Sequence, residues 1–179
     1  MMRWFLWSLL GVLVGILAHL LSVIALPRLS TQTGFERIAA IIGGNGFTVV
    51  PAEKTPLPMP DPAITSAFCR YNLASSAVRL HVPISSGFLS ISFYTTAGLN
   101  FYSLTDRAAA NGAIDLTLYT SAQLAQVRAN EGPDLPGVLR LQAPQEKGLV
   151  VLRALIPEPG EKAQTQLALS DASCGPAGS

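Results

Sequence analysis

The stretch that decides how this chain is organised is WFLWSLLGVLVGILAHLLSVIAL, residues 4–26, which contains no charged side chain. It follows directly after Met1, Met2 and Arg3. As an α-helix rising about 1.5 Å per residue it reaches about 34 Å, enough to cross a hydrocarbon core of about 30 Å. The stretch therefore predicts a single transmembrane helix within residues 1–27.

A cleavable signal peptide is the competing interpretation of the same stretch. Val23 and Ala25 occupy the minus-three and minus-one positions of a small-residue cleavage site. However, the apolar run exceeds the roughly 15 residues of a signal sequence, and Trp4 and Trp7 lie where an interfacial aromatic belt is expected. We therefore expect an uncleaved anchor in the lipid bilayer.

One side of this helix carries small and polar residues, whereas the other side carries Leu, Val and Phe. The small and polar residues recur at spacings of three and four, and they are Ser8, Gly11, Gly15, Ala18, His19 and Ser22. Such a stripe lets two helix backbones approach closely in lipid, so it predicts a packing face for a partner helix, from a second copy or another membrane protein. His19 either faces that partner or, with equal weight, bonds a helical carbonyl or interfacial water.

About 150 residues follow the helix, which is the size of one domain. The 12 basic and 11 acidic residues are spread without runs and give a formal net charge of +1. Because nucleic-acid binding needs a basic surface, this balance argues against a nucleic-acid partner.

Two cysteines, Cys69 and Cys174, stand about a hundred positions apart and outside any C-x-x-C motif. With His19 and His81 as the only histidines, a structural zinc site lacks ligands, and we expect no metal and no cofactor. A disulfide is favoured over two independent buried thiols, on the condition of an oxidising compartment. Charges flanking the helix are nearly balanced, and long domains are translocated largely regardless of them, so we expect an exported domain.

Residues 28–62 are expected to form a helical neck and a proline-rich strap. Pro27 is expected to end the membrane helix, after which Ser30 or Thr31 caps a short helix that continues to about Ile42.

Five prolines within residues 51–62 predict an extended strap rather than a regular helix. Asp61, directly before Pro62, is interpreted as the cap of a short turn.

Residues 63–179 are expected to form a β-rich domain, since the period between Phe68 and Tyr119 is two. The apolar members of the alternating runs are Val78, Leu80, Val82, Leu89, Ile91, Phe93, Ile114, Leu116 and Leu118. Each run predicts a strand with one dry face, and Asn111-Gly112 predicts a turn with positive φ. The fold class is therefore α+β, a transmembrane helix followed by a mainly antiparallel, meander-like or sandwich-like sheet domain with two or three short helices.

The C-terminal third predicts two helices and a pair of strands. Ser121–Glu131 has helix formers and a capping Ser or Thr at its start. A strand pair is expected near residues 138–141 and 149–156, the second strand being apolar on both sides as in the centre of a sheet. A last helix is expected from about Gly160 to Ser170, ahead of Cys174.

The best candidate for a polar site is Arg79 with His81, on the polar side of one predicted strand, near Tyr94, Tyr102 and Asp115 of neighbouring strands. A solvated sheet face produces the same pattern and is the preferred interpretation. No Ser lies in a G-x-S-x-G elbow and no paired carboxylates occur at a suggestive spacing, so no catalytic residue is assigned.

Several features together carry a resemblance to a known family. They are the helix ending in Leu26-Pro27, the strap ending in Asp61-Pro62, the run Cys69-Arg70-Tyr71-Asn72-Leu73, the run from Val150 to Pro157, and the final helix closing on Cys174. The chain resembles the DUF1254 family of small integral membrane proteins from Gram-negative bacteria, especially alphaproteobacteria. That family has no agreed activity, so the resemblance implies only a bacterial inner-membrane protein with an exported domain.

The matching positions include Arg70, Tyr71 and Arg153, and each also has a structural explanation. Candidate binding residues are thus Arg70, Tyr71, Arg79 and His81. The leading functional prediction is a single-pass accessory or binding protein of the inner membrane, with its C-terminal domain in the periplasm. The alternative is an envelope enzyme with a polar site around His81 and Arg79.

Overall fold

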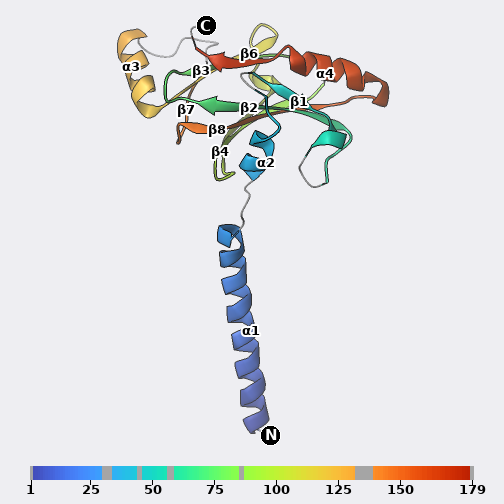
Figure 1. The fold of residues 1–179 in the computed structure, drawn as a ribbon, viewed down its shortest axis with the longest axis vertical. Helices are drawn as coiled ribbons and strands as arrows, with labels where there is room; N and C mark the ends of the chain where they lie inside the picture. The colour runs from blue at the N-terminus through green and yellow to red at the C-terminus, as the bar shows by residue number, and fades with distance from the viewer. Residues whose placement is uncertain are drawn as a thin grey trace. The chain divides into compact units, whose positions relative to one another are not determined.

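A computed structural model describes residues 2–29, 34–43, 46–55, 59–84, 87–131 and 139–177. The chain divides into two compact units, residues 1–33 and residues 34–179 (Figure 1). The helices are α1 (Met2–Leu29), α2 (Gly34–Ala39), α3 (Ser121–Glu131) and α4 (Lys162–Ser170), with short 3-10 turns η1 (Ala52–Lys54), η2 (Asp106–Ala108) and η3 (Pro159–Glu161). The strands are β1 (Thr48–Val50), β2 (Ile64–Asn72), β3 (Val78–Pro83), β4 (Leu89–Thr95), β5 (Asn100–Thr105), β6 (Ala113–Tyr119), β7 (Leu139–Gln142), β8 (Lys147–Leu155) and β9 (Ser173–Pro176).

The first unit consists of α1, which is long and apolar enough over Met2–Leu26 to cross a membrane. The helix continues to Leu29, so the prediction that Pro27 ends it is wrong. A proline removes one N–H donor from the helical ladder, and the two residues after it can still adopt helical dihedrals. The predicted caps of the next helix, Ser30 and Thr31, lie outside the described residues.

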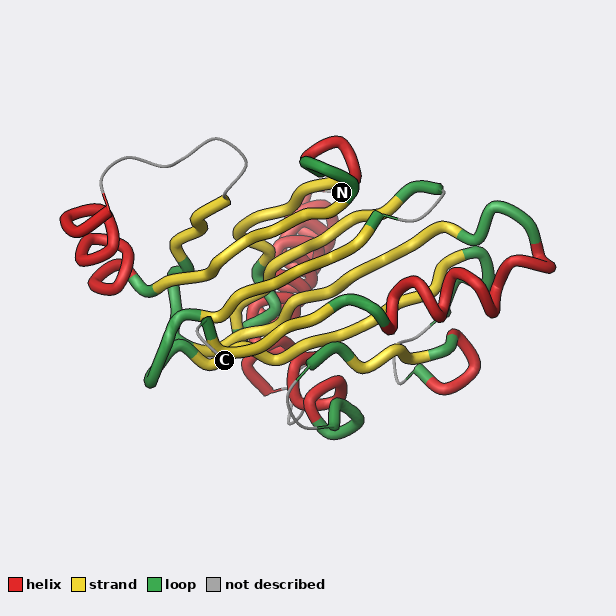
Figure 2. Tube along the Cα trace, turned by 90° about the horizontal axis from the view of Figure 1, so that it is seen from above, coloured by secondary structure: helices red, strands yellow, loops and turns green. Residues whose placement is uncertain are grey.

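The second unit contains two sheets with a common core between them. One has the strand order β1-β2-β8-β4-β5 and is antiparallel throughout; we call it sheet A. The other, sheet B, has the order β7-β6-β3-β9 and is antiparallel except for the β6/β7 pair. Figure 2 shows these strands from above, with α3 and α4 at the margins. The predicted α+β class is confirmed.

The alternating runs form strands with one buried face, as the period of two predicts. In β3, β4 and β6 every second residue is buried. The inward side chains of both sheets make one cluster, to which Leu80, Phe93, Leu118 and Leu152 each contribute while almost fully buried. Burying each such side chain stabilises the fold by roughly 1.5–3 kcal/mol, so this core holds the two sheets together.

β8 lies at the centre of sheet A and is buried on both faces from Gly148 to Leu152, whereas its outward residues Arg153 and Leu155 are exposed. Its inward residues join the main core, whereas Val151 packs outward against Phe68, Ile38 and Ile42 in a second cluster. Ile38 belongs to α2, so residues that the sequence assigns to a neck share a buried cluster with the sheet domain.

Strand pairing differs from the predicted order of neighbours. The runs at residues 138–141 and 149–156 were expected to pair with each other, but β7 pairs with β6 and β8 lies between β2 and β4. Val138 lies outside the described residues. Among the strands β2 to β6 of the predicted meander, β4 and β5 are the pair that are neighbours both in sequence and in a sheet. The other consecutive strands do not pair, because the chain crosses from one sheet to the other after β2, β3 and β5. Alternation defines which face is dry and leaves the choice of partner strand to long-range packing.

Three local predictions about turns and caps are confirmed. Asn111 and Gly112 have φ angles of 54° and 80°, the positive values expected for that turn. Thr120 Oγ1 accepts the Gln123 N–H, and Gln123 Oε1 accepts the Thr120 N–H, which is a capping box for α3. Asp61 Oδ1 accepts the N–H of Ala63 at 2.9 Å.

Cys69 and Cys174 form a disulfide, with their Cα atoms 6.6 Å apart. Both are buried, and the bridge joins β2 of sheet A to β9 of sheet B through the core. The predicted pairing is therefore present, although Cys174 lies in a strand that follows the last helix.

Candidate functional site

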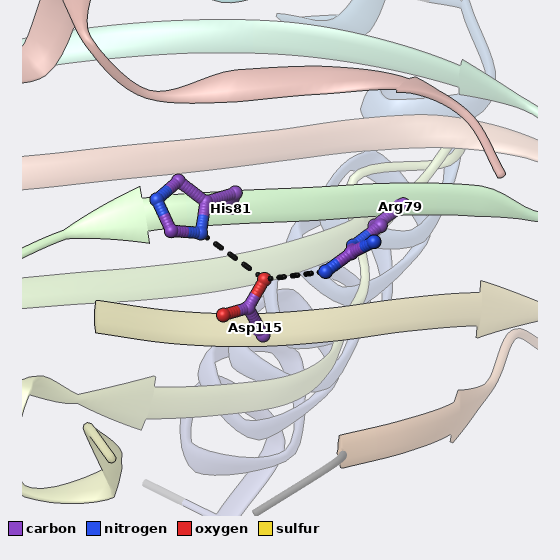
Figure 3. Close-up of polar contacts among 3 residues, drawn as sticks. All are labelled: Arg79, His81 and Asp115. Atoms are coloured by element: carbon purple, nitrogen blue, oxygen red, sulfur yellow. Dashed lines mark hydrogen bonds and ion pairs between the residues drawn. The ribbon is translucent and has the colours of Figure 1, made fainter. Parts of the chain in front are cut away.

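Arg79 and His81 reach solvent because they occupy the outward positions of β3, between the buried residues Val78, Leu80 and Val82. In the pairing of β3 with β6, His81 stands opposite Asp115. Arg79 Nη2 donates to Asp115 Oδ1 at 3.2 Å, and His81 Nδ1 lies 3.1 Å from the same oxygen (Figure 3). The predicted association of these three residues is thus present on the outer face of sheet B.

The carboxylate of Asp115 organises this cluster. Partial burial raises its pKa, but the hydrogen bonds and the charges of His81 and Arg79 together lower it by more, so the pKa lies below the ordinary value for Asp. The side chains of Arg79, His81 and Asp115 are 64%, 45% and 36% exposed, which keeps each ion pair in high dielectric. Such pairs contribute at most about 1 kcal/mol, so the cluster adds little to stability.

An open hollow borders this cluster on the side of β9. Its walls include Phe47, Arg79, His81, Ser170, Ser173 and Gly175. The register explains the space, since the residues opposite Arg79 and His81 on β9 are the small Gly175 and Ser173. Arg79 and His81 can therefore be reached from both solvent and β9.

The register also aligns three polar side chains across three strands. Ser173 of β9 stands opposite His81 of β3, which stands opposite Asp115 of β6. Because a carboxylate only accepts hydrogen bonds, the contact with Asp115 requires a hydrogen on His81 Nδ1. When the imidazole ring is neutral, its Nε2 is then a hydrogen-bond acceptor. In the part of the chain that the structure describes, Ser173 makes no hydrogen bond to His81.

The other polar candidates do not join this cluster. Tyr94 and Tyr102, expected near His81, lie on β4 and β5 of sheet A. Arg70 is exposed on the outer face of sheet A, whereas Tyr71, the next residue of β2, is buried in the core. Successive residues of a strand point to opposite faces, so Arg70 and Tyr71 cannot share one site.

Metal ligation has no support in the described ranges. No group of three or more His, Cys, Asp or Glu side chains comes together there as metal ligands do. The polar cluster instead offers a guanidinium, an imidazole and a carboxylate for hydrogen bonding.

The stripe on α1 remains a prediction about packing. Its members Ser8, Gly11, Gly15, His19 and Ser22 are all exposed, and a Cβ atom at either glycine would meet open space. Ser22 Oγ donates to the Ala18 carbonyl at 2.8 Å, so the helix itself satisfies this hydroxyl.

A second hollow lies on the outer face of sheet A, and the sequence did not predict a site there. Arg153 lines it together with Ser66 and residues of the proline-rich strap. The available signal was the interruption of an apolar run, because Arg153 is the only charged residue in residues 149–156.

Comparisons with known proteins show a shared fold. No family model matches the chain, and no curated protein matches it. The VPA0106 protein from Vibrio parahaemolyticus is similar in structure, with a TM-score of 0.56 and 10% identity over 78% of this chain and 32% of that protein. An uncharacterized protein from Burkholderia cenocepacia gives a TM-score of 0.51 and 12% identity over 79% of this chain and 37% of its own. This chain therefore spans about a third of the length of either protein, and its resemblance to the DUF1254 family stays a prediction.

Proposed function

We propose that this chain is a membrane-anchored binding protein of the bacterial envelope, with α1 in the inner membrane and the sheet domain in the periplasm. The apolar α1 and the disulfide support this location, because structural disulfides persist in oxidising compartments. The role is that of an accessory protein, which binds a ligand or partner with its sheet domain and packs α1 against another transmembrane helix.

The observation that carries the binding role is the hollow beside Arg79 and His81. Small residues of β9 leave both side chains accessible, and Asp115 holds them in place. A preorganised pair of donors on an open surface suits recognition of a polar partner, since little side-chain freedom is lost on binding.

A photo-crosslinking experiment in membranes of the native host tests this role. With p-benzoylphenylalanine at Phe47, which lines the hollow, we expect a specific adduct that Arg79→Ala and His81→Ala both abolish. The matched control carries the same label at Phe88, an exposed phenylalanine ahead of β4 in sheet A, and should give no such adduct. An adduct that survives both substitutions contradicts the proposal.

An envelope enzyme is the second candidate, favoured by the row Ser173, His81 and Asp115. In such an enzyme His81 Nε2 would take the proton of Ser173 Oγ while Asp115 orients the ring. Binding ranks first because Ser173 and His81 share no hydrogen bond among the described residues. Rescue of a deletion phenotype separates the two: an enzyme loses function with Ser173→Ala, whereas a binding protein tolerates the loss of one hydroxyl. Full rescue by Arg79→Ala/His81→Ala would remove both candidates, because the enzyme and the binding site each need these side chains.

A further inference from the structure

Arg153 occupies an unusual place in sheet A. It lies on β8, the central strand, and points to the outer face, where the residues opposite it on the two neighbouring strands are Ser66 of β2 and Ser90 of β4. Two small side chains therefore flank a long cationic one. They leave a depression in the surface around Arg153, whereas the outer face near Phe68 and Val151 is covered by α2.

Residues on both sides of positions 56–58, from 50–55 and 59–64, border this depression and make it a hollow of about 260 Å³. Apolar walls come from Val50, Met59, Pro60 and Ile64, and polar groups come from Thr55, Asp61, Ser66 and Arg153. One contact links the segment beside the hollow to another element, and a second stabilises a local turn at Asp61. Glu53 of η1 forms an ion pair with Lys162 of α4, and Asp61 accepts the Ala63 N–H.

The charges inside the hollow select the kind of ligand. Arg153 forms no ion pair or side-chain hydrogen bond with any residue that the structure describes, so its guanidinium is available for an anion. A planar guanidinium matches a carboxylate with two parallel hydrogen bonds. Asp61 lies in the same hollow without pairing with Arg153, and its negative charge disfavours a dianion such as phosphate.

We infer that this hollow is a binding site for a small apolar molecule that bears one carboxylate, held by Arg153 and Ser66 with its apolar part against Val50 and Ile64. The volume lies just below the range of ordinary small-molecule pockets, which restricts the ligand to a compact one. The site is separate from the cluster of Arg79, His81 and Asp115, because the two lie on different sheets. Ligand binding at this site does not depend on the binding role proposed for Arg79 and His81.

Titration of the full-length chain in detergent micelles with hexanoate tests this site. We follow the side-chain N–H signal of Arg153 and the backbone N–H signal of Ser66 by NMR. Hexanoate should shift both signals saturably, whereas 1-hexanol and hexylamine, which lack the carboxylate, should not. Arg153→Gln should weaken hexanoate binding about tenfold or more, measured at Ser66, because it removes a charged hydrogen-bond partner.

Arg70→Gln is the matched control, since Arg70 is an exposed arginine on the outer face of the same sheet and does not line the hollow. It should leave hexanoate affinity unchanged. Ser66→Leu, which fills the hollow and keeps Arg153, should abolish saturable binding. The inference is overturned if the shifts grow linearly as in simple partitioning, if Arg153→Gln retains the affinity, or if inorganic phosphate binds as tightly as hexanoate.

Discussion

The hydroxyl group of Tyr71 is buried in the core without a hydrogen-bond partner in the described structure. Burial raises the pKa of this phenol to about 12, so the group stays neutral at physiological pH. An unsatisfied buried hydroxyl costs roughly 1–3 kcal/mol relative to one that is hydrogen-bonded. Tyr71 is therefore better understood as a large core side chain than as a binding residue.

Replacing Tyr71 by Phe should leave the free energy of unfolding unchanged or raise it by about 1 kcal/mol, because the ring is kept and an unpaired polar atom is removed. Urea unfolding followed by circular dichroism measures the change. Tyr71→Ala, as control, should cost about 3–5 kcal/mol through the cavity that it leaves. A loss of more than 1 kcal/mol in Tyr71→Phe would show that the hydroxyl has a partner.

Gly148, in β8, leaves room for this same hydroxyl. A Cβ atom at Gly148 would lie 2.3 Å from Tyr71 Oη and 2.3 Å from the Tyr94 carbonyl oxygen. Gly148→Ala should therefore destabilise the domain by about 3 kcal/mol through overpacking. Gly175→Ala is the matched control on a strand, since a Cβ there meets nothing within 4 Å. Equal thermal unfolding temperatures for the two variants would contradict this contact.

Asp115 makes stability depend weakly on pH. Its pKa is lower in the folded chain than in the unfolded one, so its contribution is fully present above about pH 4 and is lost as pH falls through the lowered value. Below pH 4 the wild type should lose more stability than Asp115→Asn, by less than about 1 kcal/mol because the group is partly exposed. Thermal unfolding between pH 6 and pH 3 measures this, with Asp171→Asn as the surface control. Parallel curves for wild type and Asp115→Asn would show that the cluster does not form.

At the scale of single elements, α1 and the strands show what local pattern can do. α1 needs no tertiary partner to be helical, since its backbone hydrogen bonds are internal and its exposed apolar side chains suit lipid. The strands, by contrast, acquire partners from distant parts of the chain, as β8 does from β2 and β4.

The stripe on α1 predicts association with a second transmembrane helix. Gly15→Leu should reduce the signal of a membrane reporter of helix association, because a large side chain separates the two backbones and removes close contacts. Leu13→Ala, on another face of α1, should change the signal little. Equal signals for both variants and the wild type would contradict the packing face.

At the scale of the whole molecule, the disulfide joins the two sheets and closes a loop of 105 residues. The double substitution Cys69→Ala/Cys174→Ala should lower the free energy of unfolding by up to about 4–5 kcal/mol, mainly by freeing the unfolded chain. Urea unfolding of the purified chain with and without reductant provides the measurement. Both cysteines labelled by a thiol reagent in intact, non-reduced cells would contradict the bridge and, with it, the proposed periplasmic location.

The sequence by itself determined the apolar helix, the dry faces of β3, β4 and β6, the central position of β8, the caps at Asp61 and Thr120, and the cysteine pair as the favoured bridge. Each of these depends on residues close together in the chain, or on there being only two cysteines. For the site, Asp115 lies opposite His81 on the polar face that the sequence predicted. Tyr94 and Tyr102, which were predicted near His81, lie on the other sheet.

The tertiary structure alone decided which strands pair, the division into two sheets, and the placing of Thr55 and residues 59–61 beside the exposed Arg153. The alternating pattern of a strand indicates which of its side chains are buried. It does not choose the partner, since any two such strands present the same backbone donors and acceptors to each other. The choice among them comes from packing across the core, where Cys69 of one sheet meets Cys174 of the other. The hollow at Arg153 arises in the same way, because its walls come from residues 50–55 and 59–66 and its cation from β8, about ninety positions later.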